Sequence, residues 1–115
     1  HRPVAEVRLI GPSGRELYDY PYVDSGADHT LLPYRVGRYL RLPSSGDVIR
    51  EAKGINGSVA VIYSEIEVEI AGVRFRAKVA WAQIEGVPLL LGRADVFDRF
   101  EITFRQAKNV VEFRA

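Results

Sequence analysis

Cysteine is absent from this sequence, and histidine occurs only twice, as His1 and His29. Without cysteine, neither a disulfide framework nor a thiolate metal site can form. One internal histidine is too few for a histidine-based zinc site and a weak basis for a Ser-His-Asp triad. The sequence therefore predicts neither a bound metal nor a cofactor.

Long apolar runs and an excess of one charge are also missing. No stretch reaches the length that spans a bilayer, and no signal peptide is visible. The 16 basic residues are scattered and the net charge is +1, so we expect neither a membrane span nor a nucleic-acid partner. The chain begins without methionine, which we interpret as a trimmed chain or one domain of a longer protein; its compartment is not defined.

What is present is the composition of a globular domain. The chain has 115 residues, of which 47% are hydrophobic and 27% are charged. This length is enough to bury a core without disulfides, so we expect a single domain over residues 1–115.

Short strand patterns separated by turn residues run through the first half of the chain. Residues 4–10 alternate between apolar and polar side chains, which predicts a strand. Residues 17–23 are tyrosine-rich and strand-like, with an edge or a break at Pro21. Residues 33–42 predict a short helix whose middle is weakened by Gly37.

The clearest pattern is a hairpin over residues 65–79. Glutamates alternate with apolar residues before Ala71-Gly72, and arginine or lysine alternates with apolar residues after it. A two-residue turn there places three glutamates opposite three basic residues: Glu65 opposite Lys78, Glu67 opposite Arg76 and Glu69 opposite Arg74. Each pair contributes roughly 0.2–1 kcal/mol. We interpret this row as a solvated face and not as a binding site.

The last third of the chain predicts further short elements. Residues 87–92 read as a buried strand that ends at Gly92, residues 93–100 as a short helix, and residues 101–104 with 109–113 as a final hairpin. Together the patterns predict a mainly β protein, a small closed barrel or sandwich with one or two short helices.

One stretch, VDSGADHTLLP at residues 23–33, carries chemistry. Asp-Ser-Gly alone is typical of a turn, but here it lies between apolar segments. The stretch resembles the active-site loop of the retropepsins, the single-domain aspartic proteases of retroviruses and their relatives. GINGSVAVI at residues 54–62 resembles their glycine-rich flap, within a flap region of about residues 49–62. PLLLGRADVFDRFEITF at residues 88–104 resembles their late Gly-Arg signature and the helix and strand that follow.

The resemblance implies peptide-bond hydrolysis by two carboxylates that share a proton, one acting as base on a water and the other as acid. This chain has one Asp-Ser-Gly, because Asp95 and Asp98 are not followed by Ser/Thr-Gly. The second carboxylate is therefore expected from a second copy, with Asp24 facing its own image in a homodimer.

The resemblance also implies a role for each matched residue. Asp24 is the catalytic carboxylate, Ser25 locks the two loops together, and Gly26 permits the tight loop and directs its N–H to the carboxylate. Asp28 accepts hydrogen bonds from the substrate backbone. Three residues support the loop: Thr30, Gly92 and Arg93, the last paired with Asp28 or, alternatively, only solvated.

Further residues are implied to contact a peptide or protein substrate. Gly54, Ile55, Asn56 and Gly57 form the flap tip, and Val23, Pro88 and Leu90 line apolar pockets unless they simply pack in the core. Many viral members carry an acid where this chain has His29, so a different and pH-sensitive outer pocket is expected. The final hairpin also extends beyond the family's last strand, so the resemblance does not define the mode of dimerisation.

Two other interpretations remain open from the sequence. The fold can serve as a non-catalytic dimerisation or peptide-binding module of a larger protein. The other interpretation is an unrelated small β-barrel that binds a ligand. It requires the three ordered motif matches to be coincidental.

Overall fold

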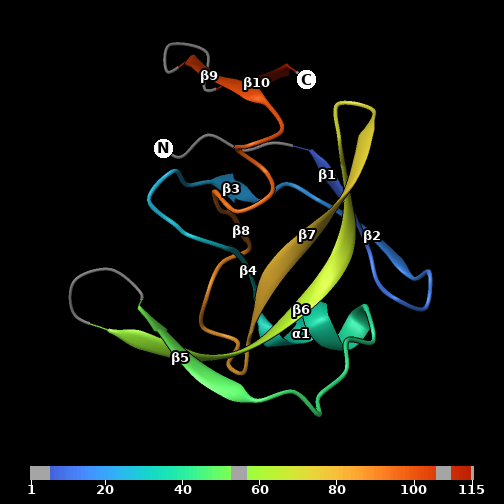
Figure 1. Ribbon diagram of the computed structural model, residues 1–115, viewed down its shortest axis with the longest axis vertical. Helices are drawn as coiled ribbons and strands as arrows, with labels where there is room; N and C mark the ends of the chain where they lie inside the picture. The colour runs from blue at the N-terminus through green and yellow to red at the C-terminus, as the bar shows by residue number, and fades with distance from the viewer. Residues whose placement is uncertain (1–5, 53–56, 106–109, 115) are drawn as a thin grey trace.

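The computed structural model describes residues 6–52, 57–105 and 110–114, and strands dominate these residues (Figure 1). Its strands are β1 (Val7–Ile10), β2 (Glu16–Asp19), β3 (Tyr22–Val23), β4 (Thr30–Leu32), β5 (Val48–Ala52), β6 (Ser58–Ile70), β7 (Val73–Ala82), β8 (Leu90–Leu91), β9 (Glu101–Arg105) and β10 (Val110–Arg114). One α-helix, α1 (Tyr34–Tyr39), occurs among the described residues. The prediction of a mainly β fold is confirmed.

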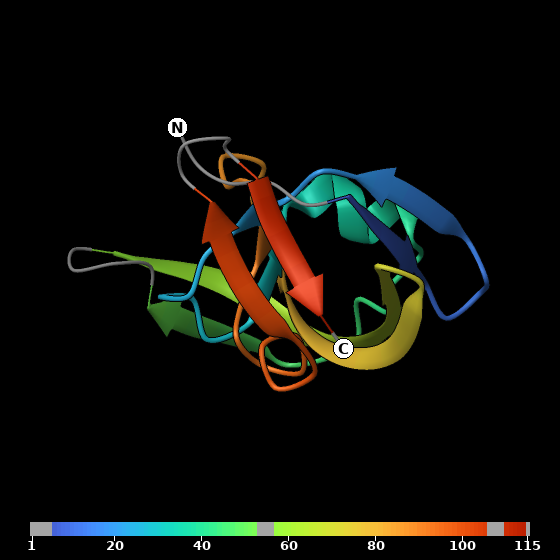
Figure 2. The same cartoon turned by 90° about the horizontal axis from the view of Figure 1, so that it is seen from above.

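Eight of the strands form one sheet in the order β2-β1-β6-β7-β4-β8-β3, with β5 paired to β6 beside this path. The long strands β6 and β7 curve strongly, so the sheet curls around its core (Figure 2). Strands β9 and β10 form a separate two-stranded sheet (Figures 1 and 2).

The β6–β7 hairpin has the predicted register. Glu65 lies opposite Lys78, Glu67 opposite Arg76 and Glu69 opposite Arg74. Both turn residues have positive φ, 52° at Ala71 and 79° at Gly72, which suits a two-residue turn between twisted strands. The alternate side chains, including Ile66 and Val68, are buried in the core. The charge pattern and the buried face therefore specify the same register.

The core is closed on one side by α1, which packs on Trp81 of β7. Trp81 is fully buried, and its indole Nε1–H donates to the carbonyl oxygen of Tyr34 at 3.0 Å. A Cβ atom at Gly37 would lie only 2.1 Å from that Nε1. The glycine that weakens the helix by propensity is thus the residue that lets the helix approach the indole.

Of the predictions for the late segment, the helix was wrong and the strand was too long. Residues 94–99 form consecutive turns instead of a helix, since Asp95 adopts φ 67° and its Oδ2 accepts the backbone N–H of Lys78 at 2.8 Å. A left-handed residue cannot continue an α-helix. The strand predicted over residues 87–92 is limited to β8, Leu90–Leu91. The predicted break at Pro21 is confirmed, since β2 ends before it and β3 begins after it.

Candidate active site

The loop between β3 and β4 carries Asp24 and is anchored to β8. Strands β3 and β8 pair in parallel, with Val23 beside Leu91. The pairing continues into the loop, because the backbone N–H of Asp24 donates to the carbonyl oxygen of Leu91 at 3.0 Å. Asp24 itself is partly buried. The late strand β8 therefore sets the point at which Asp24 leaves the sheet.

The loop then folds back on Asp24. The backbone N–H of Gly26 donates to Asp24 Oδ1 at 2.9 Å, and the N–H of Ala27 donates to the carbonyl oxygen of Asp24 at 3.2 Å. A Cβ atom at Gly26 would lie 3.2 Å from the same Oδ1. Ser25 and Gly26 are exposed. The result is a carboxylate oriented by the backbone at the edge of the molecule.

Gly92 closes the loop from the opposite side. Its N–H donates to Thr30 Oγ1 at 3.2 Å, and Thr30 is 0% exposed. A Cβ atom at Gly92 would lie 2.3 Å from the carbonyl carbon and oxygen of His29. Glycine is therefore needed here to allow the two backbone segments to approach each other closely.

The predicted ion pair between Arg93 and Asp28 is present. Arg93 Nη2 lies 2.6 Å from Asp28 Oδ1, and both side chains are largely exposed. The backbone adds two bonds, from Arg93 N–H to the carbonyl oxygen of Ala27 at 2.9 Å and from Ala94 N–H to that of Asp28 at 2.8 Å. Because exposed ion pairs contribute only about 0–1 kcal/mol, the backbone bonds hold this corner and the ion pair orients Asp28.

The remaining predicted contact residues are placed unevenly. Gly54, Ile55 and Asn56 lie outside the described residues, while Gly57 is exposed just before β6. Val23 is 6% exposed and belongs to the main core, so packing accounts for it. Pro88 and Leu90 are partly exposed.

A cluster beside the loop was missed in the sequence. The imidazole of His29 lies edge-on to the Tyr63 ring with centroids 5.0 Å apart, and its Nδ1 lies 3.6 Å from Glu51 Oε1. The Tyr63 hydroxyl donates to the other oxygen, Glu51 Oε2, at 2.5 Å. Burial, followed by this hydrogen bond, raises the pKa of Tyr63 to about 12. No local pattern connects these residues, because the loop and the β5–β6 hairpin meet only in the fold.

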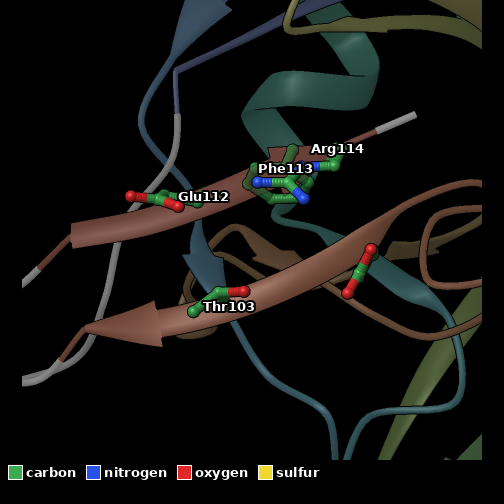
Figure 3. A pocket seen from close by; sticks show the side chains of 5 residues that line it. Thr103, Glu112, Phe113 and Arg114 are labelled. Carbon is green, nitrogen blue, oxygen red and sulfur yellow. The ribbon is translucent and has the colours of Figure 1, made fainter.

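A shallow hollow lies on the β9–β10 hairpin (Figure 3). Its lining consists of polar or charged side chains and one aromatic ring: Glu101, Thr103, Glu112, Phe113 and Arg114. None of these residues belongs to the Asp24 loop or to the segment that anchors it.

Neither a metal centre nor a membrane span is suggested within the described ranges. No group of three or more histidine or acidic side chains there is arranged to hold a metal ion. No helix in these ranges is both long and apolar enough to cross a membrane.

Comparisons with known proteins give a fold and no sequence family. No family model matches the chain, and no curated protein matches it. Among the matching solved structures is EIAV protease complexed with the inhibitor HBY-793, at 22% identity and a TM-score of 0.56, covering 81% of this chain and 83% of that protease. The chain thus has a retropepsin-like β fold. One solved protein that shares this fold is thus a retroviral protease.

Proposed function

We propose that this chain is an aspartic endopeptidase that acts as a homodimer, with the protease unit spanning residues 1–115. The observation that carries the proposal is Asp24, oriented by the N–H of Gly26 in the loop of a retropepsin-like fold. The two Asp24 carboxylates of a dimer would share one proton and activate a water for attack on a peptide bond.

The surrounding residues would support this chemistry. Ser25 would bond across to the partner's loop, and Thr30, Gly92 and Arg93 would hold the loop in shape. Asp28 would accept substrate backbone N–H groups while Arg93 orients it. The substrate contacts would be completed by the flap (Gly54, Ile55, Asn56 and Gly57) and by the side chains of Pro88 and Leu90.

A second copy is required by the number of carboxylates in the motif. Two like charges at short distance cannot both ionise easily, which is what makes one of them an acid and the other a base. The sequence provides one Asp-Ser-Gly, so an isolated chain would have half of the catalytic pair. The separate β9–β10 sheet has edges outside the main sheet and would contribute to the contact between copies.

Asp24→Asn tests the catalytic assignment. The substitution keeps the size of the side chain and its acceptor oxygen for Gly26 but removes the charge that activates water. We expect cleavage of a peptide or casein to fall by at least about a thousandfold between about pH 4 and pH 7. Equal cleavage by both proteins would refute the role of Asp24. Absence of cleavage in both would favour the non-catalytic module.

Sedimentation tests the shared site independently. Under the conditions of cleavage we expect a dimer, with activity per chain falling on dilution as the dimer dissociates. A strict monomer that still cleaves the substrate would rule out a site built from two Asp24 residues.

A further inference from the structure

The catalytic loop is joined to the β5–β6 hairpin through one imidazole. His29 belongs to the loop, Glu51 to β5 and Tyr63 to β6. The side chains of His29 and Glu51 are only 23% and 18% exposed. The Tyr63 hydroxyl is bonded to Glu51 Oε2, which leaves Oε1 as the oxygen that faces His29.

His29 and Glu51 lie close together but are not hydrogen-bonded to each other. The distance of 3.6 Å from Nδ1 to Oε1 is beyond that of an N–H···O hydrogen bond. Nδ1 is buried, and it has no hydrogen-bond partner in the described part of the chain. A buried nitrogen that faces a carboxylate oxygen becomes a favourable donor once the ring is protonated.

Other charged groups near the pair already have partners. Lys78 Nζ lies over the Tyr63 ring, 4.5 Å from its centroid, and the Asp95 carboxylate accepts the backbone N–H of Lys78. Asp28, next to His29 in the chain, is paired with Arg93. Glu51 is therefore the carboxylate available to a charged imidazole.

We propose that His29 and Glu51 form a proton-dependent tie between the catalytic loop and the β5–β6 hairpin, with Glu51 acting as a positioning residue. Histidine gains its charge between about pH 8 and pH 5, a range in which carboxylates are ordinarily ionised. The tie is present when the imidazole carries both N–H protons and is lost when the imidazole is neutral. Tyr63 holds Glu51 in place throughout, because its raised pKa keeps the hydroxyl protonated.

Backbone hydrogen exchange tests the tie without reference to catalysis. After correction for intrinsic rates, we expect the β5 amides of the wild type to be about tenfold better protected at about pH 5.5 than at about pH 8. His29→Gln and Glu51→Gln should each abolish this difference. Glu65→Gln is the control, because it removes a carboxylate of β6 whose partner is the exposed Arg76. This variant should retain the difference in protection between the two pH values. A pH difference that persists in both His29→Gln and Glu51→Gln would overturn the proposal.

Kinetics test the consequence for the site, and this part rests on the proposed function. We expect the KM of the wild type to rise severalfold between about pH 5.5 and pH 8, and the KM of Glu51→Gln to change much less over the same range. The effect on the kcat of the wild type should be smaller than the effect on its KM. A matched KM dependence in the two proteins would refute positioning through this pair. An inactive wild type whose β5 protection still depends on His29 and Glu51 would refute the proposed function and leave the tie supported.

Discussion

At the scale of single residues, position 92 requires glycine because a side chain would clash with the neighbouring backbone, and not because the position has a positive φ. Its φ is not among the positive values, but a Cβ atom would lie 2.3 Å from the backbone carbonyl of His29. Backbone atoms that are held by neighbouring strands cannot move aside as a flexible side chain can. The resemblance implied that Gly92 supports the loop, and the residue by itself reads as an ordinary strand end.

Gly92→Ala should lower the free energy of unfolding by about 1–3 kcal/mol or more, since it overpacks a backbone crossing. Gly86→Ala is the matched control, because a Cβ atom there meets nothing within 4 Å and φ is not positive. The control should be neutral or stabilising by up to about 1 kcal/mol. Urea unfolding measures both. Equal free energies of unfolding for the two variants would contradict the close approach of the Gly92 and His29 backbones.

The raised pKa of Tyr63 predicts a change in the stability of the fold at alkaline pH. Its pKa in the folded chain is about 12, against about 10 for an unfolded tyrosine. The neutral hydroxyl is therefore favoured by folding, and its contribution is complete below about pH 10 and lost as the pH rises towards 12. The stability difference between wild type and Tyr63→Phe should narrow over this interval in unfolding measurements. A constant difference would show that the Tyr63 hydroxyl does not have the raised pKa.

At the scale of elements, prediction succeeded where the determining interactions are local. The β6–β7 register follows from alternating charge and a two-residue turn, so neighbouring residues suffice to define it. Residues 93–100 have an apolar spacing typical of a helix, but Asp95 bonds to the distant backbone of Lys78 and interrupts it. That contact joins residues 17 positions apart in different segments, so the apolar spacing within residues 93–100 does not reveal it.

Helix α1 gives a test in which propensity and packing oppose each other. Gly37→Ala improves helix propensity by about 1 kcal/mol, yet its Cβ would lie 2.1 Å from Trp81 Nε1. We expect packing to dominate, with a net loss of about 1–3 kcal/mol in the free energy of unfolding. Trp81 is the one tryptophan of the chain, so its fluorescence should change as well.

Arg35→Ala in the same helix is the control for that test. Arg35 is exposed and makes only a 3.5 Å surface contact with Glu85. Its replacement should alter the free energy of unfolding by less than about 0.5 kcal/mol and leave the fluorescence unchanged. A stabilised Gly37→Ala variant would show that α1 can withdraw from the indole without cost.

At the scale of the whole molecule, the site depends on strand neighbours that are far apart in sequence. Strand β4 pairs with β7 in parallel, and β3 pairs with β8 in parallel. Such pairings were not predictable from the strand patterns alone, and neither was the cluster of His29, Glu51 and Tyr63. The Asp24 loop and its late partner segment were recognised because their motifs resemble those of a known family.

Mixing experiments test the proposed dimer as a whole. When wild type is mixed with an equal amount of Asp24→Asn and the subunits exchange, the activity of the wild-type chains should fall to about one half, because mixed dimers have a single carboxylate. A large excess of the variant should nearly abolish cleavage. Mass spectrometry would verify exchange. Unchanged activity after verified exchange would mean that each chain is catalytically independent.

The close backbone approach at Gly92 also determines when, during synthesis, the Asp24 loop can adopt its final conformation. Gly92 bonds Thr30 across 62 residues of chain, and Arg93 bonds Asp28 across 65. A growing polypeptide that has left the ribosome only as far as the β6–β7 hairpin contains Asp24 but none of the segment that anchors it. Since contacts of such long range form late, a partly synthesised chain cannot hold Asp24 in its final position. The Asp24 loop therefore reaches its final geometry only after the segment around Gly92 and Arg93 has been synthesised.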